Sequence, residues 1–301
     1  MKTRIYILLT FLTFQVSYAQ TEEFICGIQN DNTPDELGVY SYNADLNSLN
    51  NYGPVVHNIF IWGINKDDGT SDDIVTQVDA LELVATLNIE YNRFNMFFKY
   101  SGFDYINETD IYIPQTSGAI HNYVTQNEEF EQQDAINFYI PYEFGSGAAG
   151  YGGVRRAYAS KQYLIPYTII HEIGHVYNLR HIFSGEGGSN CEHVTRDPLD
   201  LDDLNDPNDT FFNAHDAGDH LVDTAACPQM RGSATVGEDC DYVGSGMDCQ
   251  GTDFIINDEA KNYMGYNEIR CVDHLTIGQG IRMREKIDTG YFNFAENTIS
   301  S

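Results

Sequence analysis

The chain has 301 residues, of which 13% are aromatic, and its 45 acidic residues against 16 basic ones give a net charge of −29 at pH 7. The aromatic content excludes a disordered chain, and the length is enough for one large domain or two small ones. An acidic surface repels nucleic acid phosphates and anionic membranes, so neither is an expected partner.

The first 19 residues have the pattern of a signal peptide. Lys2 and Arg4 form a basic start, residues 5–14 are apolar, and Ser17–Ala19 is a small-x-small cleavage site. The apolar run is too short to anchor the chain in a bilayer, and no later stretch approaches the length of a membrane span. We therefore predict a secreted protein, extracellular or periplasmic, without membrane insertion. Residues 20–52 are polar and turn-rich, which indicates an N-terminal extension or a pro-segment.

Apolar patterning predicts a mixed sheet with helices over the first half of the chain. A buried strand is expected from Val55 to Trp62, followed by a helix that Ser71 caps and whose apolar positions are Ile74, Val78, Leu81, Val84, Ala85 and Leu87. Further strands are expected at residues 95–103, 110–113, 135–142 and 154–158. The glycine-rich residues 145–153 are interpreted as a loop, and a helix carrying His171 and His175 follows.

The second half is predicted to be loop-rich and stapled by disulfides. Five of the six cysteines lie between residues 191 and 271. A zinc site built from cysteines would need CxxC-like pairs, which the sequence lacks, and the sequence alone does not choose the disulfide pairing. Residues 197–209 are strongly acidic and could bind Ca²⁺, but they lack EF-hand spacing, so a solvated loop is the alternative. Thr276 and Gln279 form a capping box for a final helix, from Ile277 to about Ile287.

The stretch from His171 to His181 has the spacing of a zinc site. His171 and His175 are four residues apart, so on a helix both imidazoles lie on one face and can bind one metal ion. Glu172 points to a different side and can reach a water molecule on that metal. If the helix ends near Asn178, the chain can double back and bring in His181. A catalytic Zn²⁺ has three protein ligands and one open position; the alternative is a buried helix with hydrogen-bonded histidines.

The pattern resembles the metzincins and, within them, the pappalysin family. That family shows HExxH, two residues, glycine, two residues and histidine, then a methionine turn, often Asn-x-Met-x-Tyr. The matching residues here are His171, Glu172, His175, His181 and Met264. Residues 218–224 (GDHLVDT) are similar to the family's GD…DT segment, and residues 271–283 to its C-terminal helix.

The resemblance covers residues 55–287 and implies an α/β fold of the metzincin α+β type. It predicts a twisted mixed sheet with two long helices in an upper subdomain, 53–181. A loop-rich, disulfide-stapled lower subdomain with a final helix, 182–290, completes a catalytic domain at 53–290, before a tail at 291–301. The family's glycine is Asn178 here. Asn is the next most tolerant residue in the left-handed conformation that this turn needs, so the site is expected to form.

The resemblance implies a zinc-dependent endopeptidase that acts on protein or peptide substrates. Glu172 is expected to be the general base that takes a proton from the attacking water. Tyr266 is expected to stabilise the oxyanion, with simple packing as the alternative, and Met264 to pack beneath the metal. An extended substrate is expected along residues 150–157. Arg270 is expected in the wall of the pocket for the residue after the cleaved bond, or else in solvent.

Cys26 has two interpretations. Some family members are kept latent by a pro-segment cysteine whose thiolate takes the fourth zinc position, which would make the chain a zymogen. The resemblance also implies disulfides Cys191–Cys249 and Cys227–Cys271. Cys26 and Cys240 are then left over and could pair with each other instead.

Two other functions compete with the peptidase. The first is a catalytically inactive scaffold used in binding or adhesion, which would not need Glu172. The second is a zinc amidase acting on peptidoglycan or small amides, for which the extended strand edge would have no purpose.

Overall fold

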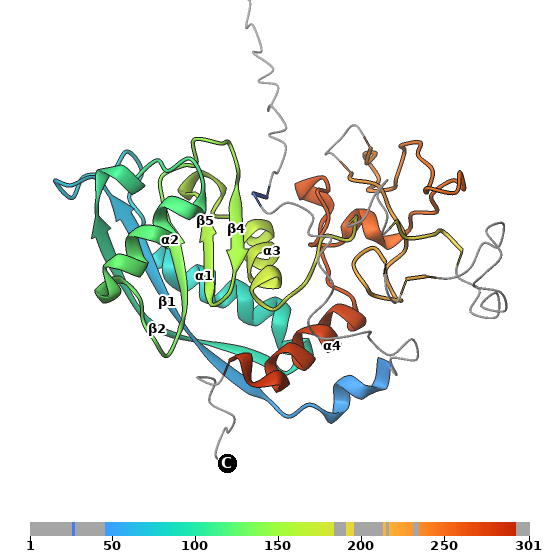
Figure 1. Cartoon of the computed structure of the whole chain (residues 1–301), viewed down its shortest axis with the longest axis horizontal. Helices are drawn as coiled ribbons and strands as arrows, with labels where there is room; N and C mark the ends of the chain where they lie inside the picture. The colour runs from blue at the N-terminus through green and yellow to red at the C-terminus, as the bar shows by residue number, and fades with distance from the viewer. Residues whose placement is uncertain are drawn as a thin grey trace, which may run out of the picture.

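A five-stranded sheet organises the first half of the chain (Figure 1). In this computed structural model, residues 26–27, 46–183, 191–195, 213–214, 217–230 and 235–292 are described. The expected signal peptide, the acidic stretch 197–209 and the tail beyond residue 292 lie outside them. The strands, in the order in which they lie side by side, are β2 (Met96–Asn107), β1 (Val55–Asn65), β3 (Ile136–Ile140), β5 (Arg156–Ala159) and β4 (Gly150–Gly153). β1 is parallel to β2 and β3, β3 is parallel to β5, and β4 pairs with β5 in the antiparallel direction.

Helices cover both faces of the sheet. Helices α1 (Gln77–Tyr91) and α3 (Pro166–Val176) pack on one face and share a core with alternate strand residues such as Phe138. Helix α2 (Ser117–Gln126) covers the other face, where Tyr139 belongs to a second core. The period-two alternation along β3 therefore supplies both cores. None of the described helices is long and apolar enough to cross a bilayer.

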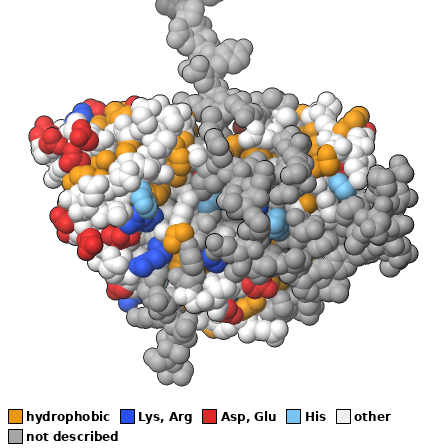
Figure 2. Space-filling view, in the orientation of Figure 1, with side chains coloured by type: hydrophobic (Ala, Val, Ile, Leu, Met, Phe, Trp, Pro, Cys, Tyr) orange, Lys and Arg blue, Asp and Glu red, His pale blue; other side chains and the backbone are white. Residues whose placement is uncertain are grey.

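Helix α4 (Ile277–Lys286) packs from the second half of the chain against the short helices η1 and η2 (Figure 1). The short helical turns are η1 (Leu46–Asn51), η2 (Asn92–Phe94), η3 (Thr109–Ile111), η4 (Glu128–Phe130), η5 (Lys161–Tyr163), η8 (Asp258–Lys261), η9 (Ile269–Cys271) and η10 (Ile287–Tyr291). On the face shown in Figure 2, carboxylate side chains gather over the sheet half of the molecule, in line with the net negative charge.

The first helix begins later than the sequence predicts. Its N-cap is Thr76, which forms a capping box with Asp79, and Ser71 lies outside it. Of the expected apolar stripe, Ile74, Val78 and Leu81 are 44%, 62% and 48% exposed, whereas Val84 and Leu87 are buried, so only part of it faces the core. The core face is the neighbouring stripe of Ala80, Leu83, Val84, Leu87 and Tyr91.

Three further elements differ from the prediction. The weak strand at 110–113 is instead the helical turn η3, and α2 had not been predicted. Part of the glycine-rich stretch is strand β4, which packs on α3. A Cβ at Gly150 would lie 2.7 Å from Glu172 Oε1, and one at Gly152 would collide with the backbone of Glu172. These glycines therefore permit close strand-to-helix packing, which a flexible loop would not require.

Two disulfides staple the second half. Cys191 is bonded to Cys249, the pair that the resemblance implies, with Cα atoms 6.2 Å apart. Cys271 is bonded to Cys240, so the implied Cys227–Cys271 pair is wrong. The Cα atoms of Cys240 and Cys271 lie 5.4 Å apart, within the narrow range that a disulfide spans. Cys227 is buried in the core outside any disulfide.

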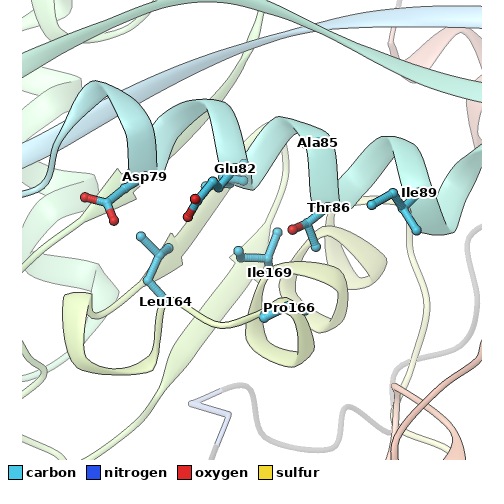
Figure 3. Close-up of a pocket in the computed structure, with 9 residues that line it drawn as sticks. Asp79, Glu82, Ala85, Thr86, Ile89, Leu164, Pro166 and Ile169 are labelled. Atoms are coloured by element: carbon cyan, nitrogen blue, oxygen red, sulfur yellow. The ribbon is translucent and has the colours of Figure 1, made fainter.

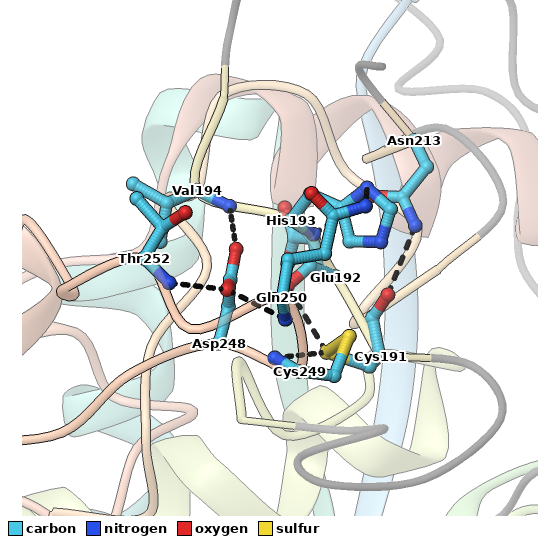
Figure 4. The surroundings of a disulfide bond; sticks show 9 residues. All are labelled: Cys191, Glu192, His193, Val194, Asn213, Asp248, Cys249, Gln250 and Thr252. Carbon is cyan, nitrogen blue, oxygen red and sulfur yellow. Dashed lines mark hydrogen bonds between the residues drawn. A yellow bond between two sulfur atoms is a disulfide. The ribbon is translucent and has the colours of Figure 1, made fainter. Parts of the chain in front are cut away.

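The surroundings of the first disulfide are held by one carboxylate (Figure 4). Asp248 is buried and accepts backbone N–H bonds from Val194, Gln250 and Thr252 at 2.9 Å each. These bonds lower the pKa of Asp248 against the opposing effect of burial. In this loop region, the Asp248 carboxylate thus accepts the backbone N–H bonds that a helix or strand would otherwise satisfy.

Candidate metal centre

Helix α3 and the turn that ends it bring three histidines together. His171 and His175 lie one helical turn apart, and Asn178 then takes a left-handed backbone with φ 70°. Two bonds close the helix end, from Asn178 N to His175 O at 2.9 Å and from Leu179 N to Gly174 O at 3.0 Å. This is a Schellman motif, which reverses the chain and delivers His181.

The three imidazoles present their Nε2 atoms to one point. Nε2 of His175 lies 3.1 Å from Nε2 of His171 and 3.1 Å from Nε2 of His181, and the third side of the triangle is 3.2 Å. Nitrogens bound at about 2.0–2.1 Å to a tetrahedral zinc ion would lie about 3.3 Å apart. The donor set and its spacing therefore fit Zn²⁺. Among the described residues, the group of His, Cys, Asp or Glu side chains that could hold a metal is this one, with Cys26 as its fourth member.

Backbone carbonyls fix the tautomers of two ligands. His171 Nδ1 donates to Tyr263 O at 2.6 Å, and His175 Nδ1 donates to Leu179 O at 2.9 Å. A carbonyl can only accept, so each Nδ1 carries the proton and each Nε2 keeps its lone pair for a metal. Burial lowers the pKa of His175 to about 4 and lowers the pKa values of His171 and His181 well below their ordinary range. All three imidazoles are therefore neutral at neutral pH and could bind a metal ion.

Glu172 is fully buried beside the histidines. Burial raises the pKa of its carboxyl group well above the ordinary value, against the lowering effect of a hydrogen bond from Cys26. Its Oε1 atom has no hydrogen-bond partner among the described residues. A buried carboxyl oxygen without a donor can accept a hydrogen bond from a molecule that enters the site.

The methionine turn lies against the end of α3. Met264 is fully buried, and a Cβ at Gly174 would lie 2.7 Å from its Sδ atom, so the turn packs tightly on the helix behind the ligands. Asn262 Oδ1 accepts a bond from Met264 N at 2.8 Å, and Met264 O accepts one from Ile182 N at 3.1 Å. The turn is thus tied to the residue that follows the third histidine.

Tyr266 borders the ligands. Its ring is 4.9 Å from that of His181 in an edge-to-face arrangement, and its hydroxyl donates to Cys26 O at 2.8 Å.

Cys26 sits at the mouth of the histidine triangle. Its Sγ atom is 3.6 Å from His175 Nε2 and 3.6 Å from Glu172 Oε2. The ligand atoms of Cys26 and the three histidines all lie within 4.8 Å of one another. Gly27 N donates to Gly150 O at 2.9 Å, which anchors this short segment on strand β4. The alternative pairing of Cys26 with Cys240 is not formed, because Cys240 is bonded to Cys271.

Two other candidates do not join the centre. Arg270 donates from Nη1 to Glu238 O at 2.7 Å and from Nη2 to Gly237 O at 2.9 Å, which ties it to the loop beside the Cys240–Cys271 disulfide. Its role in a substrate pocket stays a prediction. Cys227 also lies outside the group around the histidines.

Sequence reasoning missed the carbonyls of Tyr263 and Leu179, since a backbone acceptor leaves no trace in residue type. It also missed Arg282 of α4, which is fully buried and donates to Asn178 O. The sequence indicated a buried arginine only through the position of this basic residue between the apolar residues Ile281 and Met283.

A groove elsewhere is separate from the centre. It has a volume of about 310 Å³ and lies between α1 and the start of α3, with Glu82, Leu164 and Pro166 in its lining (Figure 3). No ligand histidine lines it.

The comparisons agree with this centre. The peptidase family model described as pregnancy-associated plasma protein-A matches residues 151–288, which include the three histidines, Met264 and α4. Pappalysin-1 of Homo sapiens is 28% identical over 125 residues, covering 42% of this chain and 6% of that protein. An extracellular metalloprotease of Verticillium alfalfae is 29% identical over 123 residues, covering 41% of this chain and 31% of that protein. This chain thus spans less than a third of either relative's length.

Metalloproteinase-II from Bacteroides fragilis aligns with a TM-score of 0.33 and 16% identity over 45% of this chain and 46% of that one, a similarity too low to bear on the fold. The family match and the two relatives agree with the candidate centre, because the matched segment contains His171, His175, His181 and Met264. Residues 151–288 of this chain thus match the pappalysin family of metallopeptidases.

Proposed function

We propose that this chain is a secreted, zinc-dependent endopeptidase whose catalytic unit is residues 53–290. The observation that carries the proposal is the triangle of three neutral Nε2 atoms, 3.1–3.2 Å apart, beside the buried carboxylate of Glu172. When bound by His171, His175 and His181, zinc supplies a Lewis acid that polarises a peptide carbonyl and acidifies water.

Glu172 supplies the proton transfers in this mechanism. Its carboxylate accepts a proton from the attacking water as the water oxygen bonds to the carbonyl carbon. It then passes this proton to the nitrogen of the leaving amine, and the carbon–nitrogen bond breaks. Burial of Glu172 supports this role, because a raised pKa makes its carboxylate a stronger base toward the attacking water.

In this proposal, the substrate binds along the outer edge of strand β4. β4 is the last strand in the sheet order and runs beside α3. The bond from Gly27 N to Gly150 O supports it, since an extended segment already pairs there. Tyr266 donates its hydroxyl to the carbonyl of Cys26 in the same place, as an oxyanion-stabilising group would toward a substrate carbonyl.

The same contacts support latency. Cys26 lies within reach of the fourth ligand position and its neighbour occupies the edge of β4, so the segment would exclude substrate and water together. We propose that residues 20–52 form a pro-segment and that its removal activates the enzyme. Export to an extracellular or periplasmic space is supported by the two disulfides and by the name of the fungal relative.

The proposed function is tested by measuring which class of substrate the protein cleaves. Protein freed of its pro-segment and loaded with zinc should degrade casein, and an excess of chelator should stop the reaction. Hydrolysis of small amides or peptidoglycan without casein cleavage would favour the amidase. A zinc-loaded protein that cleaves nothing would favour the binding scaffold.

A further inference from the structure

Helix α4 carries an arginine in the interior of the protein. Arg282 is 0% exposed, between Ile281 and Met283 in the helix. Removing a guanidinium from water is unfavourable unless its donors find acceptors inside the protein. The guanidinium of Arg282 must therefore be bonded to acceptors inside the protein, and its planar set of N–H donors can hold those acceptors in fixed positions.

The partner is the turn between the second and third histidines. Arg282 Nε donates to Asn178 O at 2.7 Å, and Nη1 donates to Asp219 O at 3.4 Å. Asn178 has the left-handed backbone that turns the chain toward His181. The guanidinium thus ties this turn to the segment beginning at Gly218.

One peptide unit in the turn is held from both ends. The unit joining Asn178 to Leu179 has its carbonyl bonded to Arg282 and its N–H bonded to Gly174 O. The next carbonyl, Leu179 O, accepts the bond that fixes the His175 tautomer. Rotation of the first unit would therefore disturb both the orientation of His175 and the approach of His181.

The same helix also holds the methionine turn. Gln279, three residues before Arg282, exchanges two hydrogen bonds with Asn262, at 3.0 and 3.1 Å. Asn262 in turn accepts from Met264 N. Residues three apart lie on one helix face, so a single face of α4 supports the metal centre at two points.

We propose that Arg282 is a positioning residue for the metal centre, which it serves by fixing the peptide unit that sets His175 and His181. This inference rests on the proposed zinc site. Loss of a partner that orients a ligand typically weakens metal binding about 10- to 100-fold.

Arg284 offers a matched control two residues away. It is also a buried arginine of α4 that donates to two backbone carbonyls, those of Asn95 and Gly53, each at 2.7 Å. Neither acceptor belongs to the turns around the histidines. Arg282→Met and Arg284→Met therefore remove similar bonds from the same helix, but only Arg282 donates a hydrogen bond to the turn between the histidines.

The experiment measures zinc affinity of the full chain by competition with a chelating dye, and records the absorption spectrum of the Co²⁺ form. Arg282→Met should bind zinc at least about 10-fold more weakly than the parent chain and change the Co²⁺ bands, which report ligand geometry. Arg284→Met should lose thermal stability but keep the parent affinity and spectrum.

Equal zinc affinity and equal Co²⁺ spectra in Arg282→Met and the parent would overturn the inference, as would equal weakening in both arginine variants. If Arg282→Met does not fold, Arg282→Lys decides. Lysine keeps the charge without the fork of donors, so it should weaken zinc binding and shift the Co²⁺ bands; parent-like binding would refute the role. A parent chain that binds no zinc would instead refute the proposed metal site.

Discussion

The left-handed backbone of Asn178 turns the chain toward His181 and so determines the geometry of the site. With φ 70° it occupies a conformation that glycine adopts freely and that most side chains resist by about 1–2 kcal/mol. The resemblance to the pappalysins places a glycine here, and the structure shows why asparagine can replace it: the left-handed turn and both of its closing bonds form.

Asn178→Gly is expected to leave zinc affinity unchanged and to alter the free energy of unfolding by no more than about 1 kcal/mol, because glycine accepts the same backbone. Asn178→Val should lose about 1–2 kcal/mol and bind zinc more weakly. Chemical denaturation and chelator competition measure both effects. Parent-like zinc binding in the valine variant would show that the turn does not control His181.

Cys26→Ser is expected to raise the peptidase activity of the unprocessed chain, because a hydroxyl is a poorer zinc ligand than a thiolate. Cleavage of a quenched peptide before any processing measures the effect. Cys227→Ser is the matched control, since Cys227 is also a buried cysteine outside a disulfide but lies away from the histidines. Equal activity in the Cys26→Ser variant and the parent would contradict the latency proposal.

At the scale of elements, helix α4 is held at its start by a residue distant in the chain. Asp223 accepts from Gly278 N at 2.7 Å and from Thr276 Oγ1 at 3.0 Å. A side chain at Gly278 would collide with Asp223. The GD…DT segment is therefore a helix cap as well as the partner of Arg282.

Asp223→Ala should lower the free energy of unfolding by about 1–2 kcal/mol, the value of a lost N-cap. Asp273→Ala is the control, because Asp273 is largely exposed and pairs only with His274 among the described ion pairs. Urea unfolding of both variants gives the comparison. A stability loss in the control as large as that in Asp223→Ala would argue against the cap.

The elements also show what sequence could and could not predict. The helix starting after Thr276 was predictable, since its capping box is local and the structure forms it. The exposed face of α1 was not, because two apolar stripes run along it and only tertiary packing chooses between them. Likewise, Cys271 could pair with several cysteines, and the pairing depends on the path of loops that have no periodicity. The histidine spacing predicted the centre. The role of Arg282 could not be predicted, because its hydrogen bonds go to backbone atoms, which residue types do not reveal.

At the scale of the whole molecule, stability should depend on pH through the core. His57 of β1 is buried, stacks on Tyr177 and Phe292, and bonds to the Tyr177 hydroxyl. Burial, and then the nearby charge of Arg284, lower the pKa of His57 to about 3. An unfolded histidine takes up its proton near pH 6.5, whereas this one stays neutral until about pH 3, so the unfolded state binds more protons between these values.

The free energy of unfolding should therefore fall as the pH is lowered from 6.5 toward 3, and His57→Gln should flatten this dependence. Denaturation of parent and variant at several pH values gives the difference between them, in which other titrating groups largely cancel. A difference that does not change with pH would show that protonation of His57 is not coupled to unfolding.

The most direct measurement of the central claim compares Glu172→Gln with the parent chain at equal zinc content, after removal of the pro-segment. Glutamine keeps the size of the side chain but cannot accept the proton, so zinc should bind as before while casein hydrolysis falls by at least about 100-fold. Full zinc occupancy with near-complete loss of turnover is the predicted result. Substantial hydrolysis by the zinc-loaded variant would contradict the assignment of Glu172 as the base.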